Sequence, residues 1–477
     1  ILSFLPIEVF LHQGFGIGQS IMMSQALVAA VLFPAIFYTA SSRLSPKVGY
    51  VFAAFTMIQI VALSYGGTEP GLSISMHYNR WAWAIGFIVI LLAFAPPRGE
   101  ERMRLDGFLF GLCLSALVFL NVTFFVAVLP GDALVLVLQK RKETILAAVV
   151  TGLVAATFAL MTLGADFWLR YIDDLLVVSR SEVRPEPGLP LVELLSQPAT
   201  IAFTIMGLLF YLMTSKAGYQ SQSLGLLLLI PGCFFITYQN YGNDHKWVIP
   251  LLALMITFRP EPGIRVFDGK DLHTSITALC AAGVLLILPS ASTLALSPIR
   301  HAAQDFSRYV PMLPALAKHQ DILVRSDRAY TMTARVEMDV PGTVWFAYRE
   351  PADRPLIPEL AGVEFPQCEI MAGSLAWINE LISDLEQADL PPKTKLFVTD
   401  ILSAFWLFGD YTPSARSAPW YYGNLSGLAD TDYVLVPKCS FVTELRNILI
   451  GELSESGYLL EPVRNNDLYV LYKVSQP

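Results

Sequence analysis

The sequence predicts an α-helical polytopic membrane bundle followed by a C-terminal α/β domain outside the membrane. The 477-residue chain is 54% hydrophobic and only 15% charged, which is less charge than a soluble protein usually carries. Apolar stretches close to the roughly 20 residues that a spanning helix needs recur along its first part. The remainder has the mixed composition of a soluble domain. We therefore expect a transmembrane domain over residues 1–297 and an extracytoplasmic domain over residues 298–477.

Ten apolar stretches are candidates for spanning helices. Residues 1–13 precede them and are predicted to lie at the membrane boundary, because this segment is short and partly polar. The stretches at 105–120, 122–139 and 246–258 are also short, so they could be tilted or partly re-entrant. The ten stretches are 18–40, 48–66, 80–96, 105–120, 122–139, 143–164, 197–215, 223–239, 246–258 and 274–296.

Cationic loops predict the orientation of the bundle. Five loops that contain Lys or Arg fall on one side if residues 105–139 cross the membrane twice, whereas the loops at 67–79 and 240–245 contain neither residue. Because short cytoplasmic loops are enriched in Lys and Arg, we expect the C-terminal domain on the outer face, and at least one further spanning helix before Ile1. The cations are Arg43, Lys47, Arg98, Arg102, Arg104, Lys140, Arg141, Lys142, Lys216, Arg259, Arg265 and Lys270.

Composition and motifs argue against several classes of function. The net charge of −8 and the lack of a basic stripe argue against nucleic-acid binding. The sequence contains no P-loop, no GxSxG and no HExxH, so nucleotide, serine or zinc hydrolysis has no support. The five cysteines form no CxxC or Cys/His cluster, and no metal ligands are predicted. Cys368 and Cys439 could pair if the C-terminal domain is extracytoplasmic.

The C-terminal domain reads as alternating strands and helices, which predicts a small sheet packed by helices. Asp400 follows a predicted strand, where many α/β sites lie, although a helix N-cap explains it as well. The aromatic run 420–422 could stack on a sugar or pack within a loop. The predicted elements are buried strands at 343–348, 395–399 and 432–436, helices at 374–388 and 440–454 with Ser440 as N-cap, and a hairpin of 458–462 with 468–474.

One polar cluster ends the loop before the third apolar stretch. It consists of His77, Tyr78, Asn79 and Arg80. Ionisable residues at membrane level are costly and are usually functional or paired, and an Arg can hold a phosphate with two parallel hydrogen bonds. Alternatively, Arg80 and the tryptophans after it form an interfacial belt.

A second polar cluster lies in the turn between two apolar stretches. Lys246 could neutralise a phosphate, and His245 could donate a proton to a leaving group. Asn240 and Asp244 belong to the same turn. The alternative is a solvated turn with a Lys whose stem lies along apolar surface.

Glu8 and His12 are i, i+4 neighbours near the N-terminus. On a helix these two side chains share one face. They could line a site, or they could mark the solvated face of the segment.

The order of these parts resembles the GT-C superfamily of polytopic membrane glycosyltransferases. The likeness is carried by the loop that ends His77–Trp81, by a helix pair that ends in the basic residues 140–142, and by the turn Asn240–Lys246. The tail segments Asp432–Lys438 and Tyr469–Lys473 are similar to those of bacterial members. The resemblance implies a polyprenyl-phosphate sugar donor, a glycan or lipid acceptor, and activity on the outer face of the bacterial inner membrane.

The same resemblance implies an inverting transfer with an acidic catalytic residue in the first outer loop. Glu8 is the substitute candidate for this base, which deprotonates the acceptor hydroxyl. Arg80, Lys246 and His245 would hold the phosphate leaving group, with the other polar residues of both clusters around the substrate. Participation of a divalent cation stays open. Two alternatives remain, namely a transporter or flippase for a lipid-linked glycan, and a non-catalytic membrane scaffold whose tail binds a partner.

Overall fold

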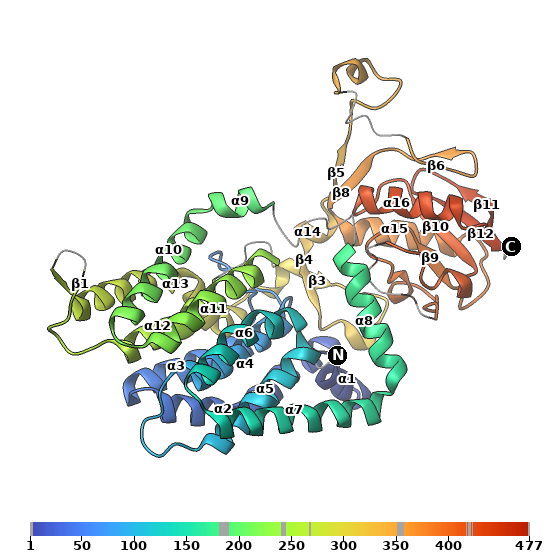
Figure 1. Ribbon diagram of the computed structural model, residues 1–477. Coiled ribbons are helices and arrows are strands. Elements are labelled where there is room, and N and C mark those ends of the chain that lie inside the picture. The colour runs from blue at the N-terminus through green and yellow to red at the C-terminus, as the bar shows by residue number, and fades with distance from the viewer. Residues whose placement is uncertain are drawn as a thin grey trace. The chain divides into compact units, whose positions relative to one another are not determined.

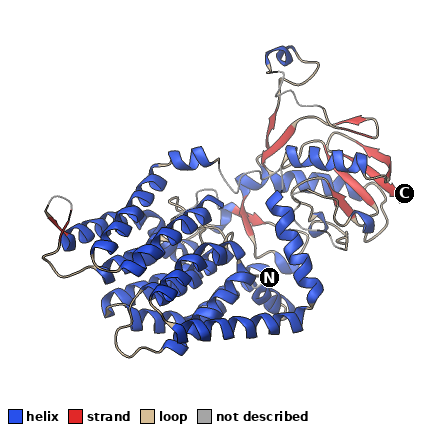
Figure 2. Cartoon of the chain, viewed as in Figure 1, coloured by secondary structure: helices blue, strands red, loops and turns tan. Residues whose placement is uncertain are grey.

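The chain divides into two compact units. A computed structural model describes residues 3–180, 190–239, 245–266, 269–350, 357–415, 417, 421 and 423–475. The first unit, here the helical unit, comprises Ile1–Phe15, Gln19–Leu169 and Glu186–Gln304. The second, here the C-terminal unit, comprises Gly16–Gly18, Arg170–Pro185 and Asp305–Pro477. Helices dominate the first, and most strands belong to the second (Figures 1 and 2).

Each of the ten predicted apolar stretches overlaps one helix of the structure. Among the described residues, seven helices are long and apolar enough to cross a membrane, and α3, α6 and α12 are shorter apolar helices. Their length and composition indicate a membrane protein. The helices are α1 (Leu5–His12), α2 (Ile17–Arg43), α3 (Pro46–Val61), α4 (His77–Phe94), α5 (Met103–Leu120), α6 (Val122–Leu138), α7 (Lys142–Leu163), α8 (Ala165–Arg180), α9 (Leu191–Ser196), α10 (Pro198–Lys216), α11 (Gln220–Gln239), α12 (Val248–Phe258) and α13 (Leu272–Ala302), and a hairpin of β1 (Arg265–Val266) and β2 (Lys270–Asp271) precedes α13.

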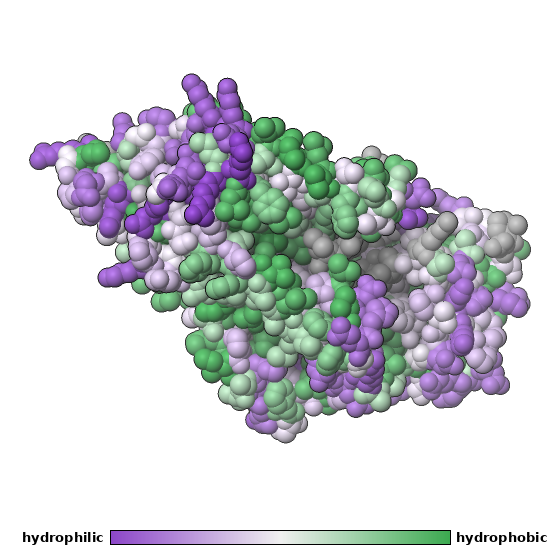
Figure 3. Space-filling model, turned by 90° about the horizontal axis from the view of Figure 1, so that it is seen from below, coloured by the Kyte–Doolittle hydropathy of each residue, from purple (hydrophilic) through white to green (hydrophobic). Residues whose placement is uncertain are grey.

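Helix α4 is the central helix of the helical unit. It packs against α3, α5, α6 and α12, and 94% of its 18 residues are buried. A helix that is apolar all round needs neighbours on every side. By contrast, only 11% of the residues in the most apolar 18-residue segment of α7 are buried. The side chains of Phe158 and Met161 are exposed. On the face shown in Figure 3, many hydrophobic residues lie at the surface beside hydrophilic groups, and extensive exposed apolar surface is typical of membrane contact.

Buried ion pairs around Asp106 join the ends of several helices. Arg43 of α2 donates from Nη2 to Asp106 Oδ2 at 2.5 Å, and Arg141 donates from Nη2 to the same oxygen at 3.0 Å. Tyr38 donates its hydroxyl to Oδ1 at 2.8 Å. Arg141 also donates to Glu101 at 3.1 Å. We call these five residues the Asp106 cluster.

The Asp106 cluster shows how the cationic loops are arranged. Asp106 lies in the first turn of α5 and Arg141 follows α6, so the pair brings both ends of residues 105–139 to one end of the bundle. Residues 105–139 thus form two helices, α5 and α6, whose outer ends lie together, as two crossings of the membrane would require. Arg43 and Arg141, predicted as loop cations, are instead buried, because each finds a carboxylate that compensates for lost hydration.

The C-terminal unit contains a four-stranded sheet of order β11-β12-β10-β9. Strand β10 (Tyr433–Pro437) pairs in parallel with β9 (Leu396–Val398) and antiparallel with β12 (Tyr469–Ser475), which forms a hairpin with β11 (Leu459–Asn465). The strands predicted at 395–399 and 432–436 and the predicted hairpin are thus confirmed. The further elements are η1 (Phe306–Arg308), β3 (Tyr309–Pro311), η2 (Ala317–His319), β4 (Leu323–Arg325), α14 (Ser326–Tyr330), β5 (Thr333–Val336), η3 (Val344–Tyr348), β6 (Glu359–Leu360), β7 (Val363–Glu364), β8 (Cys368–Ala372), α15 (Ser374–Glu386), η5 (Phe405–Leu407), η6 (Leu428–Asp430) and α16 (Thr443–Glu455).

The predicted helix at 374–388 is confirmed as α15. It buries the five residues that its spacing selected, because they line one face of the helix. These residues are Leu375, Ile378, Leu381, Ile382 and Leu385.

The predicted buried strand at 343–348 is wrong. Residues Val344–Tyr348 form the short 3₁₀ helix η3, which contains no buried residue. Trp345 is 53% exposed and Tyr348 is 84% exposed. An apolar aromatic run fits a strand by composition, but it becomes one only where a neighbouring strand can bond its backbone.

Asp400 lies at the end of β9 and caps the segment before α16. Its carboxylate accepts hydrogen bonds from the backbone N–H groups of Ile401 at 2.7 Å, Phe441 at 2.6 Å and Val442 at 3.1 Å. Ser440, the predicted N-cap, lies too early, because α16 begins at Thr443 with Val442 at the N-cap position. Burial raises the pKa of Asp400 to about 7, while the three N–H groups act in the opposite direction.

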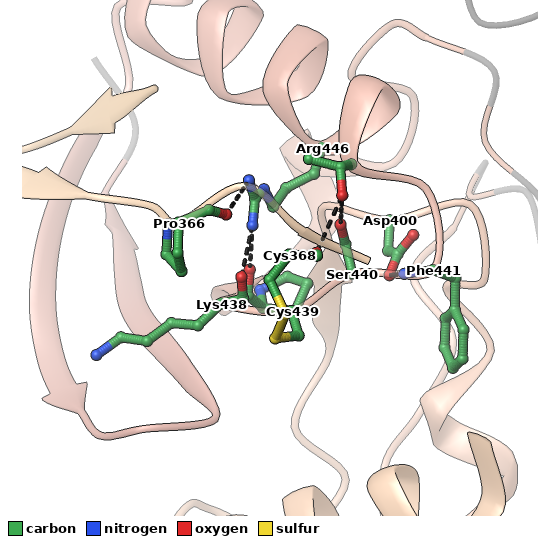
Figure 4. Close-up of a disulfide and its surroundings, with 10 residues drawn as sticks. Pro366, Cys368, Asp400, Lys438, Cys439, Ser440, Phe441 and Arg446 are labelled. Carbon is green, nitrogen blue, oxygen red and sulfur yellow. Dashed lines mark hydrogen bonds between the residues drawn. A yellow bond between two sulfur atoms is a disulfide. The ribbon is translucent and has the colours of Figure 1, made fainter. Parts of the chain in front are cut away.

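A disulfide joins Cys368 to Cys439, with their Cα atoms 4.6 Å apart (Figure 4). Beside it, Arg446 is fully buried and donates to the carbonyls of Pro366 and Lys438, each at 2.7 Å. Both contacts hold irregular backbone next to β8 and β10. The proposed pairing of the two cysteines is present.

We predict that Asp106→Asn strongly destabilises the helical unit. The substitution keeps the size of the side chain but leaves Arg43 and Arg141 facing a neutral group, and breaking a buried ion pair from one side costs about 3–5 kcal/mol. Thermal unfolding of the full chain in detergent should show a clear fall in Tm.

The matched control is Arg104→Ala, which removes an exposed pair with Glu143. Exposed pairs contribute less than about 1 kcal/mol, so its Tm should stay near that of the wild type. Equal Tm values for Asp106→Asn and the wild type would contradict the assigned role of the Asp106 cluster.

Candidate functional site

The candidate site is organised by a buried stretch of non-helical backbone, here the Ala62–Gly66 loop. Helix α3 ends at Val61, and Ala62, Leu63, Ser64 and Gly66 are buried although they are not helical. Buried backbone carbonyls need hydrogen-bond donors. At membrane depth irregular backbone is tolerated only where protein surrounds it or water reaches it. The donors around this loop therefore decide whether it can form.

Two cations bind consecutive carbonyls of the loop. Arg80 of α4 donates from Nη1 to the Ser64 carbonyl at 2.6 Å. Lys246 donates from Nζ to the Tyr65 carbonyl at 3.1 Å. The structure thus brings Arg80 and Lys246, which are 166 residues apart in the sequence, to the same short stretch of chain.

Polar side chains from other helices bind the rest of the loop. Helix α2 provides one donor, and α13 provides a donor and an acceptor, so the loop is held from several directions. The bonds are Gln25 Nε2 to the Ala62 carbonyl at 3.3 Å, Ser290 Oγ to the Gly66 carbonyl at 2.6 Å, and Leu63 N–H to Ser297 Oγ at 2.9 Å.

Arg80 is fully buried and keeps part of its guanidinium unused. Nη1 makes both of its carbonyl contacts, to Ser64 and to Ser75 at 3.0 Å. Within the described residues, Nε and Nη2 have no hydrogen-bond partner, and no carboxylate lies within ion-pair distance of Arg80. A buried cation without a counter-ion is costly. An anion beside Nε and Nη2 would compensate for that cost.

Asn79 connects Arg80 to the corner between α5 and α6. Its Oδ1 accepts a hydrogen bond from Asn121 Nδ2 at 2.9 Å. Asn121 also caps α6, because its Oδ1 accepts from the Thr123 N–H at 3.2 Å. Asn121 was not among the predicted site residues, although it stands out in the sequence as a lone amide between two apolar runs.

Helix α4 starts from a left-handed residue. Met76 has φ 58°, which is uncommon for a residue other than Gly. Its sulfur accepts hydrogen bonds from Tyr78 at 3.5 Å and Asn79 at 3.4 Å. Such backbone strain persists only where the surroundings hold it, here immediately before His77–Arg80.

His77 lies beside the N-terminal segment. Its Nε2 is 3.3 Å from the carbonyl oxygen of Ser3, and its ring packs on Trp81 at 5.0 Å between centroids. Glu8 lies farther along the same segment, in α1, and pairs with His12 at 3.6 Å. The Glu8 side chain is 64% exposed, so the structure places it on a solvated face rather than in contact with Arg80.

His245 precedes α12 in the sequence, and its side chain is buried between two aromatic rings. Its ring centroid is 4.7 Å from that of Phe203 and 6.1 Å from that of Trp247, and its Nε2 has no hydrogen-bond partner in the described part of the chain. Burial, and then the neighbouring charge of Lys246, lower the pKa of His245 to about 4. The imidazole is therefore neutral near pH 7 and holds no proton ready for a leaving group.

The remaining predicted site residues are placed as follows. Asn240 and Asp244 lie outside the described residues, as do Trp420 and Tyr422. Tyr421 is buried and donates to the Ser426 carbonyl at 2.8 Å, which favours the packed-loop interpretation of that aromatic run.

An apolar groove of about 380 Å³ runs between α5, α6 and α7. One end is formed by Val118, Phe119 and Phe125, which flank Asn121 in the sequence. The groove therefore reaches the corner to which Asn79 is bonded. The full lining is Phe110, Gly111, Leu114, Ser115, Val118, Phe119, Phe125, Leu129, Ala133, Leu136, Val137, Ile145, Ala148, Val149, Gly152, Ala156 and Trp168.

Comparison of the chain with protein families, curated proteins and solved structures found no match. A functional interpretation therefore depends on the geometry above.

We predict that His245 makes stability depend on pH. Its folded pKa of about 4 lies below the ordinary value of 6.5, so the unfolded chain binds more protons between these values. Stability should be fully present above about pH 7 and should fall as the pH decreases from 6.5 towards 4. Tm measured across this range is the test.

His245→Gln should remove this part of the pH dependence, whereas His12→Gln, at an exposed histidine, should preserve it. An identical pH profile for the wild type and His245→Gln would show that His245 titrates normally in the folded protein.

Proposed function

We propose that the protein transfers a sugar from a polyprenyl-phosphate-linked donor to a glycan or lipid acceptor. The observation that carries the proposal is the fully buried Arg80, whose Nε and Nη2 have no partner among the described residues. A phosphate group supplies two oxygens in the geometry that a guanidinium binds. It also supplies the negative charge that the buried cation needs.

Lys246 gives the same site a second cation. When the bond between sugar and phosphate breaks, negative charge grows on the phosphate oxygens, and fixed cations stabilise that charge in the transition state. Arg80 and Lys246 are held on consecutive carbonyls, so they need little rearrangement to act. His77, Tyr78 and Asn79 surround Arg80 at the start of α4 and are proposed to bind the same donor.

The apolar groove supports a donor that carries a lipid chain. Its lining is apolar apart from Ser115 and the indole of Trp168, and its end at Val118, Phe119 and Phe125 adjoins Asn121. Asn121 bonds Asn79, the residue before Arg80. A phosphate at Arg80 would therefore place an attached hydrocarbon chain near the mouth of a groove that excludes water.

The acceptor needs a base, and Glu8 is the candidate that the described residues offer. Its exposed carboxylate can approach an acceptor from solvent, and the preceding Ser3 contacts His77. In this role it would take the proton of the acceptor hydroxyl as the new glycosidic bond forms. His245, neutral near pH 7, is proposed to contribute a hydrogen bond rather than a proton.

The outer face of a bacterial inner membrane is the proposed location of the site. Arg98 donates to the Leu44 carbonyl at 2.6 Å, next to Arg43 of the Asp106 cluster, so several of the loop cations lie at one end of the bundle. Cationic ends favour the cytoplasm. The disulfide of the C-terminal unit supports an oxidising compartment for that unit.

We predict that Arg80→Gln and Lys246→Met each weaken binding of polyprenyl phosphate by at least about tenfold, since hydrogen bonds from charged groups contribute roughly 1.5–3 kcal/mol each. Native mass spectrometry of the full chain in detergent measures this binding directly. Transfer from a polyprenyl-phosphate sugar should be lost in parallel. Lys47→Met, which removes a cation at the start of α3, is the matched control.

Arg80→Lys separates a folding defect from a binding defect, because it retains one donor and the charge but not the bidentate geometry. Compared with Arg80→Gln, Arg80→Lys should bring Tm closer to the wild-type value than it brings phosphate binding. Wild-type phosphate binding in folded Arg80→Gln and Lys246→Met would refute the proposal.

A second candidate function is lipid-glycan translocation, which one observation favours. Asp132 lies inside α6, is fully buried, and has no hydrogen-bond partner in the described part of the chain. Isolated carboxyl groups within membrane helices often lie on transport or proton pathways. Under the proposed transfer, Asp132→Asn should leave donor binding by Arg80 intact. Loss of lipid movement across vesicles in this variant, with no transferase activity in the wild type, would favour the transporter.

We also predict that Cys368 and Cys439 are oxidised in cells. A thiol reagent that cannot cross the membrane should label neither residue before reduction and both afterwards, because both sulfurs are in the disulfide. Cys113 and Cys233, which are buried in the helical unit, serve as internal controls. Free thiols at both positions in freshly isolated cells would contradict the extracytoplasmic placement.

A further inference from the structure

The C-terminal unit exposes an aromatic surface around η3. Trp345 and Tyr348 have ring centroids 6.3 Å apart and planes inclined by 46°. Val336, Met338 and Val344 are also exposed beside them. Exposed apolar groups gathered in this way mark interaction sites on soluble domains. The run that composition assigned to the core is therefore a candidate binding surface.

A hollow of about 610 Å³ lies at this surface. It is lined by residues from the end of β5, from the segment that follows β5 and from η3, namely Arg335, Val336, Glu337, Met338, Asp339, Trp345 and Tyr348. Its volume falls within the roughly 300–1,000 Å³ of ligand pockets. Unlike the groove between α5, α6 and α7, it combines aromatic rings with carboxylates and a guanidinium.

Polar contacts hold the hollow in shape. Arg349 donates to Glu337 at 2.8 Å and to Asp339 at 3.1 Å, and so ties the segment after η3 to the segment after β5. Thr343 donates its hydroxyl to the Met338 carbonyl at 2.7 Å. Arg335 is held by Glu369 of β8 at 3.1 Å. These bonds fix the two sides of the hollow before any ligand arrives, which lowers the entropic cost of binding.

We propose that this hollow, here the Trp345 site, binds a saccharide. A pyranose ring with equatorial hydroxyl groups has an apolar C–H face and a polar rim. The C–H face packs against exposed aromatic rings such as Trp345 and Tyr348. The hydroxyl groups of the rim donate to Glu337 and Asp339 and accept from Arg335. The lining therefore matches both parts of one ligand.

The same features disfavour other occupants. A bilayer surface rich in anionic lipid would meet two carboxylates in the hollow, Glu337 and Asp339, which repel it. A protein partner usually buries a larger and less charged core. The saccharide inference does not depend on Arg80 or Lys246, so it stands or fails independently of the proposed transfer reaction.

The test uses the full chain in a detergent without a sugar headgroup, with cellotetraose and chitotetraose as separate probes. Saturation-transfer NMR should show contact between protein and the C–H protons of at least one probe. Trp345→Ala should weaken that binding at least about tenfold, as expected for loss of one stacking ring worth roughly 1.4 kcal/mol. The double variant Glu337→Gln, Asp339→Asn should also weaken saccharide binding, because it replaces the two carboxylates that accept hydrogen bonds from the hydroxyl groups.

Trp406→Ala is the matched control, because Trp406 is a partly exposed tryptophan of the same unit that does not line the hollow. It should leave binding unchanged, as should Arg80→Gln. Absence of contact with both probes at about 10 mM, weaker than the affinities typical of specific sites, would overturn the proposal. So would binding that Trp345→Ala leaves unchanged, or vesicle binding that depends on Trp345 when neither probe binds.

Discussion

The helical unit depends on one constraint, which is that the buried carbonyls of the Ala62–Gly66 loop need donors. Water cannot supply them inside an apolar bundle, so side chains from α2, α4, α13 and the segment before α12 do so. This requirement explains why Arg80 and Lys246 are buried at all. It also explains their position, because each is oriented by a carbonyl through part of its donor set. The donors of Arg80 that no carbonyl accepts, Nε and Nη2, are the ones on which the proposed phosphate site depends.

The buried cations at the two ends of the helical unit differ in whether a carboxylate neutralises them. In the Asp106 cluster, Arg43 and Arg141 meet the carboxylates of Asp106 and Glu101, so the charges balance and the contacts are structural. At Arg80 no carboxylate within the described residues plays that part. A buried cation that already has its counter-ion contributes to folding, whereas one without a counter-ion favours an anionic ligand. This difference, rather than any motif, supports the assignment of the site.

The C-terminal unit solves the same backbone problem and leaves a different surface. Asp400 and Arg446 bind irregular backbone around the disulfide, which accounts for both buried charges without a catalytic role. The apolar residues of η3 are not needed for the core, since α15, α16 and the four-stranded sheet already supply it. They remain exposed beside Glu337 and Asp339, where they can bind a ligand.

The sequence by itself determined the ten apolar helices, α15, the strands β9 and β10, and the hairpin of β11 with β12. These features follow from local periodicity and composition, which are readable along the chain. Only the tertiary structure decided that 343–348 is exposed, that Asp400 is a cap, that Arg43 and Arg141 are paired, and that Arg80 and Lys246 meet. Each of these depends on partners distant in the sequence, and burial and hydrogen bonding are properties of those partners rather than of the residue alone.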